Sequence, residues 1–192
     1  MKKTQRKLAR ADRQRGFTLL EAMISTVIVT VGLVGMIAVF AVAVSSTQTV
    51  QLDTLGRQKA TEALESIYTA RETAQITWAQ IQNISGGGPG IFTAGLVALT
   101  DPGPDGLDGT ADDVPASTIT VPGPSGVLTG ATPPDVPILL SNFKRQILIT
   151  NTNNPDGTPN ANLRQITVTI QYPTPTGKQR SYTVQALISS YR

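Results

Sequence analysis

The 192-residue chain contains no cysteine and no histidine. This absence excludes disulfides, Cys/His nucleophile–base pairs, Ser-His-Asp triads and zinc sites built from those ligands. No carboxylate pair falls at a recognisable catalytic spacing, so we expect the protein not to be an enzyme. Its folded part must therefore be held together by buried apolar side chains, or by a bound ion.

Charge is missing from one long stretch near the N-terminus. No charged residue lies between Glu21 and Asp53, and most of the 23 residues Ala22–Val44 are apolar. As a helix this run is about 35 Å long, enough to cross a hydrocarbon core of roughly 30 Å. We therefore expect a single-pass membrane protein whose transmembrane segment is 22–44.

The residues before this segment are strongly basic. Seven of the 16 Lys/Arg and one of the 13 Asp/Glu precede Gly16, which leaves nine basic and twelve acidic residues after it. A basic flank beside an apolar span predicts the N-terminus in the cytoplasm and the C-terminal domain outside it. The net charge of −3 after Gly16 gives no support to nucleic-acid binding, so no nucleic acid is expected as a partner.

The junction Gly16-Phe17-Thr18-Leu19-Leu20-Glu21 resembles the processing site of type IV pilins and type II secretion pseudopilins. The resemblance implies that prepilin peptidase removes the leader 1–16 by cutting between Gly16 and Phe17 and methylates the new amine of Phe17. It also implies assembly with other pilins and minor pilins on an inner-membrane platform, and final location in a pilus. The alternatives are an ordinary signal anchor, or a secretory signal, which fits poorly because the apolar run follows the cut.

Glu21 is the acid that the resemblance assigns to assembly. An unpaired carboxylate in hydrocarbon costs roughly 2.5–3.5 kcal/mol. The cationic amine of Phe17 on an adjacent subunit would remove that cost and would set the axial register of the two subunits.

The segment Val31-Gly32-Leu33-Val34-Gly35 is similar to that of PilV-like minor pilins. Major pilins often carry a proline in this part of the helix, and Val27–Val50 has none. The resemblance thus implies a minor pilin that is built into a type IV pilus or initiates it. A pseudopilin of a type II secretion system remains an alternative, because it shares the processing site, the helix and the domain.

Beyond the span, apolar residues recur at three- and four-residue steps, which predicts an amphipathic helix with one buried stripe. The stripe consists of Leu52, Leu55, Ala60, Ala63, Leu64, Ile67, Tyr68 and Ala74. We expect one long helix over about 17–72, with Ile76–Ile84 as a continuation or a separate short helix. Residues 17–85 then form the helical part, because Gly86-Gly87-Gly88-Pro89 stops any helix.

Three later runs alternate between apolar and polar residues, as half-buried strands do: Phe143–Thr150, Ile166–Tyr172 and Tyr182–Ile188. The turn formers of Asn151–Asn162 predict an exposed loop between the first two. Residues 138–192 are therefore predicted to form an antiparallel β-sheet, covered on one face by the stripe of the helix. This is an α+β arrangement, and it agrees with the pilin fold that the resemblance implies.

Residues 86–137 are rich in Gly, Pro and Asp and predict a loop region. Its acidic segment carries Asp101, Asp105, Asp108, Asp112 and Asp113. Five carboxylates among turn formers could hold Ca²⁺, although their spacing departs from the EF-hand pattern. Bound calcium would favour a third function, a calcium-dependent adhesin at a pilus tip. The alternative is a solvated loop kept open by charge repulsion.

Overall fold

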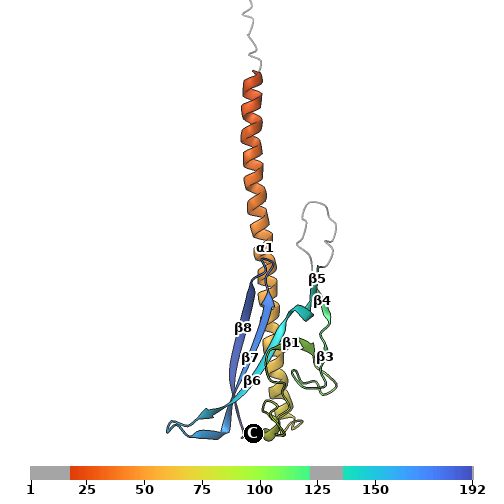
Figure 1. Ribbon diagram of the computed structural model, residues 1–192, viewed down its shortest axis with the longest axis vertical. Helices are drawn as coiled ribbons and strands as arrows, with labels where there is room; N and C mark the ends of the chain where they lie inside the picture. Colours follow the sequence, from red (N-terminus) through yellow and green to blue (C-terminus); the bar gives the residue numbers. More distant parts are fainter. Residues whose placement is uncertain (1–17, 122–135, 192) are drawn as a thin grey trace, which may run out of the picture. The chain divides into compact units, whose positions relative to one another are not determined.

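The computed structural model describes residues 18–121 and 136–191 (Figure 1). The predicted processing junction of Gly16 and Phe17 lies outside the described residues. The chain divides into two compact units, Met1–Val44 and Ser45–Arg192. Helix α1, Leu19–Glu72, contributes to both units.

In the first unit, α1 is exposed at every residue from Leu19 to Val44. It begins after Thr18, whose Oγ1 accepts a hydrogen bond of 3.3 Å from the amide of Glu21, as an N-cap does. The hydroxyls of Thr26 and Thr30 donate to helix carbonyls at 2.8 and 2.7 Å. These polar side chains are therefore satisfied within the helix itself, which suits a segment without water around it.

In the second unit, one stripe of α1 is buried against the rest of the domain. Its buried residues are Leu55, Gly56, Ala60, Ala63, Ile67 and Ala70. Most are small, which lets the sheet approach the helix closely. At Gly56 an added Cβ would lie 2.6 Å from the ring of Tyr172, so only glycine fits there. The predicted stripe is confirmed, except that Ala74 lies beyond the helix and is exposed.

The helix ends at Glu72 in a Schellman motif. The amide of Ala74 donates to the carbonyl of Arg71, and that of Gln75 to the carbonyl of Ala70, at 3.3 and 2.9 Å. Ala74 has φ 61°, a left-handed conformation that turns the chain out of the helix. A continuation of the helix over Ile76–Ile84 is therefore wrong. The separate short helix that was the other expectation is present only as the three-residue 3₁₀ helix η1, Trp78–Gln80.

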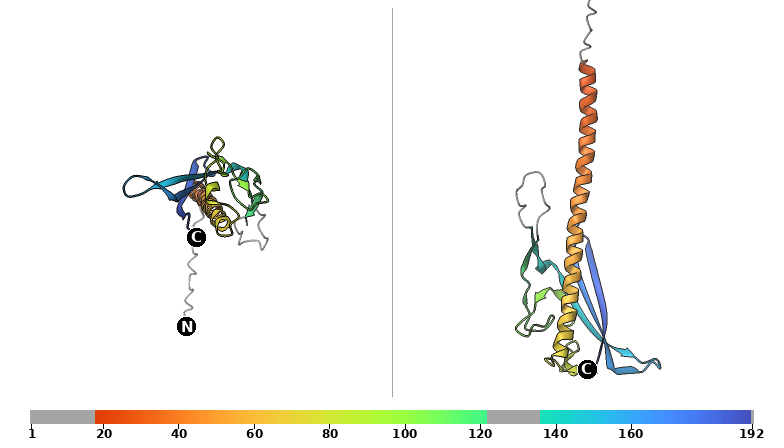
Figure 2. Two further views of the ribbon diagram at one scale, coloured as in Figure 1. Left: turned by 90° about the horizontal axis from the view of Figure 1, so that it is seen from below. Right: turned by 180° about the vertical axis from the view of Figure 1, so that it is seen from behind.

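The main sheet has four antiparallel strands in the order β1-β6-β7-β8. These are β1, Val97–Ala98; β6, Lys144–Asn153; β7, Pro159–Pro173; and β8, Gln179–Ser189. Both views of Figure 2 place the part of α1 after Ser45 against this sheet. The predicted α+β fold is thus confirmed, with alternate residues of β7, from Arg164 to Tyr172, buried on the helix side.

The predicted loop over Asn151–Asn162 is largely strand. β6 continues to Asn153, β7 begins at Pro159, and the register shifts between Asn151 and Asn153. Once apolar pairs such as Ile147 and Val168 set the register, backbone hydrogen bonds extend the ladder through polar residues. Only five residues, 154–158, form the turn.

The region 86–137, predicted as a loop, also contains strands. Besides β1, it holds β2, Thr100–Asp101, paired with β3, Val114–Pro115, and it holds β4, Thr118–Val121. β4 pairs with β5, Val136–Leu139, which leads into the 3₁₀ turn η2, Leu140–Asn142. In the acidic segment, residues 107–110 are buried, so the solvated open loop is a wrong description of that part.

Candidate assembly site and its supporting domain

Glu21 lies in the first turn of α1 and its side chain is exposed. Within the described residues, no cation lies at ion-pair distance from it. The free N–H groups of a helix N-terminus favour an acid in the first turn by about 0.3–1 kcal/mol, less than the roughly 2.5–3.5 kcal/mol cost of an acid in hydrocarbon. Glu21 is therefore a carboxylate that a cation from another molecule can still stabilise.

In the exposed segment 19–44, all sides of helix α1 are mainly apolar. Its large apolar residues are exposed by about half or more, from Leu19 and Leu20 through Val27 and Leu33 to Phe40. A helix that is hydrophobic all round belongs in a membrane or inside an assembly. By length and composition, α1 is able to span a bilayer. A Cβ added at Gly32 or Gly35 would meet no atom within 4 Å, so the packing of this chain alone does not require these glycines.

The domain contacts α1 at Asp53, the first charged residue after Glu21. Asp53 Oδ1 accepts a hydrogen bond of 2.9 Å from the Tyr172 hydroxyl, and Arg180 Nη1 donates to Asp53 Oδ2 at 2.6 Å. Burial, and then the contact with Asp53, raises the pKa of Tyr172 to about 12. The Arg57 guanidinium lies over the Tyr182 ring, 5.0 Å from its centroid. These contacts attach β7 and β8 to the helix.

A buried cation organises the acidic segment. Arg145 on β6 is only 1% exposed; its Nη1 pairs with Asp108, and its Nη2 lies 2.8 Å from Asp113 and 2.9 Å from the hydroxyl of Thr100. Two carboxylates thus share one guanidinium. Burial raises the pKa of Asp108, and the attraction of Arg145 opposes that rise. In the alternating run Phe143–Thr150, Arg145 shares a face with Phe143 and Ile147, and this spacing is the one signal in the sequence that Arg145 is buried.

The other carboxylates of the segment accept different hydrogen bonds. Asp101 accepts from Ser117, which lowers the pKa of Asp101; Asp105 accepts from the amide of Leu107, and Asp112 from Thr110. In the described part of the chain, no three acidic side chains converge as metal ligands do. The calcium site at these five aspartates therefore stays a prediction.

The contacts of a second buried arginine and of an asparagine were not predicted from the sequence patterns. Arg164 on β7 donates to the carbonyls of Trp78 and Ile81, the latter at 2.8 Å, and lies 4.2 Å from the Trp78 ring centroid. The side-chain nitrogen of Asn83 donates a hydrogen bond of 2.6 Å to the carbonyl of Ile147, and its Oδ1 accepts one of 2.8 Å from the amide of Ile149. The side chain thus makes the bonds to β6 that a neighbouring strand would make. These contacts hold the segment after α1 against the sheet. Recognising them requires the tertiary fold.

Comparison with known proteins adds one positive match. Residues 12–37 match the prokaryotic N-terminal methylation motif. This match supports a type IV pilin-like or pseudopilin precursor, and hence a structural subunit anchored in the membrane by one helix. It also implies processing by prepilin peptidase and assembly with other pilins. Neither a curated protein nor a solved structure matches the chain.

Proposed function

We propose that this protein is a minor pilin of a type IV pilus. In this proposal, prepilin peptidase cuts after Gly16 and methylates Phe17, and the subunit enters the filament through α1. The observation that carries the proposal is the methylation motif at 12–37, joined to a helix whose apolar segment 19–44 is exposed and whose first turn carries Glu21. Assembly buries that surface against neighbouring helices.

The Phe17 amine of an adjacent subunit supplies the positive charge that pairs with the Glu21 carboxylate. In the low dielectric of a helix bundle, this pair removes the cost of an isolated carboxylate. Only one stagger of the two helices brings the amine and the acid together, so the pair also fixes the axial register. Before assembly, the subunit is anchored in the inner membrane with its C-terminal domain outside the cytoplasm.

The N-terminus of the protein from its native host tests the processing step. Mass spectrometry of membrane fractions is expected to find a chain that begins with N-methylated Phe17. Replacement of Gly16 by a larger residue blocks cleavage and leaves the longer precursor, visible as a slower band. A wild-type chain that still begins at Met1 contradicts the proposal.

A pseudopilin of a type II secretion system is the second candidate, because the same motif covers both classes. Deletion of the gene separates them. Loss of pili with normal secretion of hydrolases supports the minor pilin. Loss of secreted hydrolases with normal pili supports the pseudopilin.

A further inference from the structure

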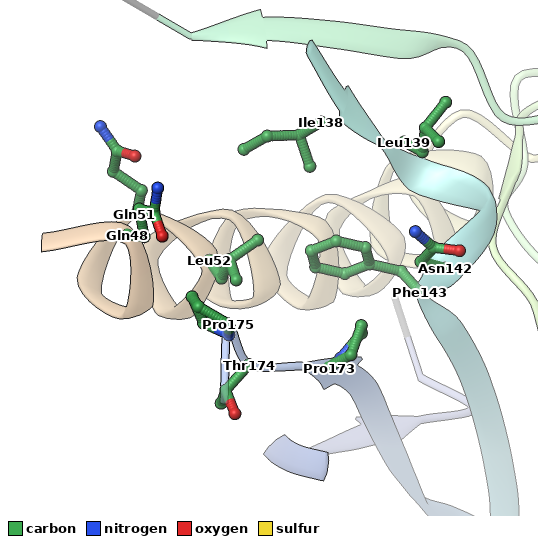
Figure 3. A pocket seen from close by; sticks show the side chains of 10 residues that line it. All are labelled: Gln48, Gln51, Leu52, Ile138, Leu139, Asn142, Phe143, Pro173, Thr174 and Pro175. Atoms are coloured by element: carbon green, nitrogen blue, oxygen red, sulfur yellow. The ribbon is translucent and has the colours of Figure 1, made fainter. Parts of the chain in front are cut away.

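An open groove of about 330 Å³ lies in the domain where α1, β5 and the β7–β8 turn meet (Figure 3). None of the described residues that line it is charged: they are Gln48, Gln51, Leu52, Ile138, Leu139, Asn142, Phe143, Pro173, Thr174 and Pro175. Figure 3 shows Leu52 and Phe143 side by side, with Ile138 on one side and the Pro173–Pro175 turn on the other. Apolar side chains from three separate parts of the domain thus line the groove, beside the polar side chains of Gln48, Gln51, Asn142 and Thr174.

The groove combines one packed aromatic residue with one exposed leucine. Phe143 is buried and stacks on Tyr172, with ring centroids 5.4 Å apart. Leu139 is 55% exposed although β5 pairs with β4 beside it. Leu139 thus presents apolar surface to solvent in the groove. Covering this surface with apolar side chains removes it from water, which is favourable in proportion to the apolar area covered.

The same chain carries an exposed surface of matching chemistry. From Ala22 to Leu52 it has no charged residue, and the side chains of 19–44 are exposed. A charged helix would lose hydration on entering this groove, because the described lining residues offer no counter-ion. An uncharged helix presents apolar side chains at no such cost, and its backbone groups are already satisfied.

We propose that the groove receives apolar side chains from the segment 22–44 of α1 in a second copy of this chain. The inference rests on the proposed function, since it assumes that subunits assemble through α1. It adds a contact between the domain of one copy and the helix of the next, besides contacts between helices.

Cysteine crosslinking in membranes and sheared filaments tests this contact, and the chain has no cysteine of its own to interfere. One full-length copy carries Leu139→Cys, and a second, differently tagged copy carries single cysteines at successive positions from Val27 to Val44. Disulfides between the two tags are expected at helix positions three to four residues apart. The matched control is Leu148→Cys, which is 45% exposed but lies outside the groove, and it is expected to give none of these links.

In a third experiment, both copies carry a single cysteine in the helix, and disulfides between them measure assembly through α1. Links between helices without any link from Leu139→Cys overturn the groove contact and leave the proposed function standing. Links only between Leu139→Cys of both copies assign the groove to a contact between domains, which also overturns the proposal. Loss of helix–helix links in correctly processed chains removes the proposed assembly and this inference with it.

Discussion

The hydroxyl of Tyr172 lies 2.9 Å from Asp53 Oδ1 and donates a hydrogen bond to it. Asp53 is the first charged residue after Glu21, so the domain attaches to α1 where the charge-free segment ends. The Tyr172 ring also packs on Gly56, one helical turn further along, where a Cβ would lie 2.6 Å away. One tyrosine of β7 therefore sets the distance between the sheet and the helix.

Titration of the tyrosines checks this contact. Burial and Asp53 raise the pKa of Tyr172 to about 12, above its ordinary value of 10.0. A raised folded-state pKa contributes stability that is complete below pH 10 and is lost between pH 10 and 12. Asp53→Asn is expected to lower this pKa, measured as tyrosinate absorbance against pH. Tyr172→Phe identifies the signal, and an unchanged high-pH transition in that variant contradicts the assignment.

Removal of the buried cation is expected to destabilise the domain strongly. Arg145→Met leaves Asp108 and Asp113 buried without their partner, which costs about 3–5 kcal/mol in the free energy of unfolding. Denaturant unfolding of residues 45–192, which contain the whole described core, measures the loss. Arg180→Met is the control, because the Arg180–Asp53 pair is half exposed and contributes about 0–1 kcal/mol. Adding Asp108→Asn and Asp113→Asn to Arg145→Met is expected to recover part of the stability; a further loss contradicts the ion-pair account.

The end of α1 offers a stabilising substitution. Ala74 has φ 61°, a conformation that costs an L-residue roughly 1 kcal/mol and glycine almost nothing. Ala74→Gly is therefore expected to raise the free energy of unfolding by about 0.5–1 kcal/mol, seen as a higher melting temperature. Ala63→Gly, inside the helix, is expected to lower it by at least a similar amount. A lower melting temperature for Ala74→Gly contradicts the strain at this residue.

Substitution of Glu21 separates processing from assembly. Glu21→Leu is expected to be cleaved and methylated normally, because the cut precedes this residue, but to enter filaments poorly. Immunoblots of membranes and of sheared filaments measure the two steps. Glu65→Leu, which removes an exposed acid further along α1, serves as the control. Normal piliation by Glu21→Leu rules out the pairing with the Phe17 amine.

Calcium titration decides the prediction made for the acidic segment. Asp108 and Asp113 pair with Arg145, whereas Asp105 and Asp112 line a common hollow. If the segment binds Ca²⁺, the melting temperature rises with the ion and falls with EGTA, and Asp105→Asn with Asp112→Asn removes the effect. An unchanged melting temperature and an unchanged protease sensitivity of the segment remove calcium, and with it the adhesin hypothesis.

The periodic parts of this fold could be predicted from the sequence, because apolar spacing reports which side of an element is buried. Leu55, Ala60 and Ile67 on the helix, and Ile166, Val168 and Ile170 on β7, are buried as their spacing predicts. The end of α1 at Glu72 also agrees with the helix expected over about 17–72. What the sequence does not indicate is the left-handed conformation of Ala74, since no glycine stands at that position.

The contacts that were missed join residues far apart in the chain. The ion pairs of Arg145 could not be predicted locally, because its partners lie in residues 100–113, which contact β6 only in the folded domain. The polar residues of 151–162 form strand because the ladder started at Ile147 and Val168 continues through them. The short strands β1–β5 likewise depend on partners that local patterns do not identify.

No side chain of Leu19–Val44 belongs to the described core, although this segment shares one helix with Leu55 and Ile67. Substitutions there leave the heat capacity and cooperativity of the domain untouched. Lipid and adjoining subunits alone then select the residues of the first half of the helix, while the sheet selects those of the second.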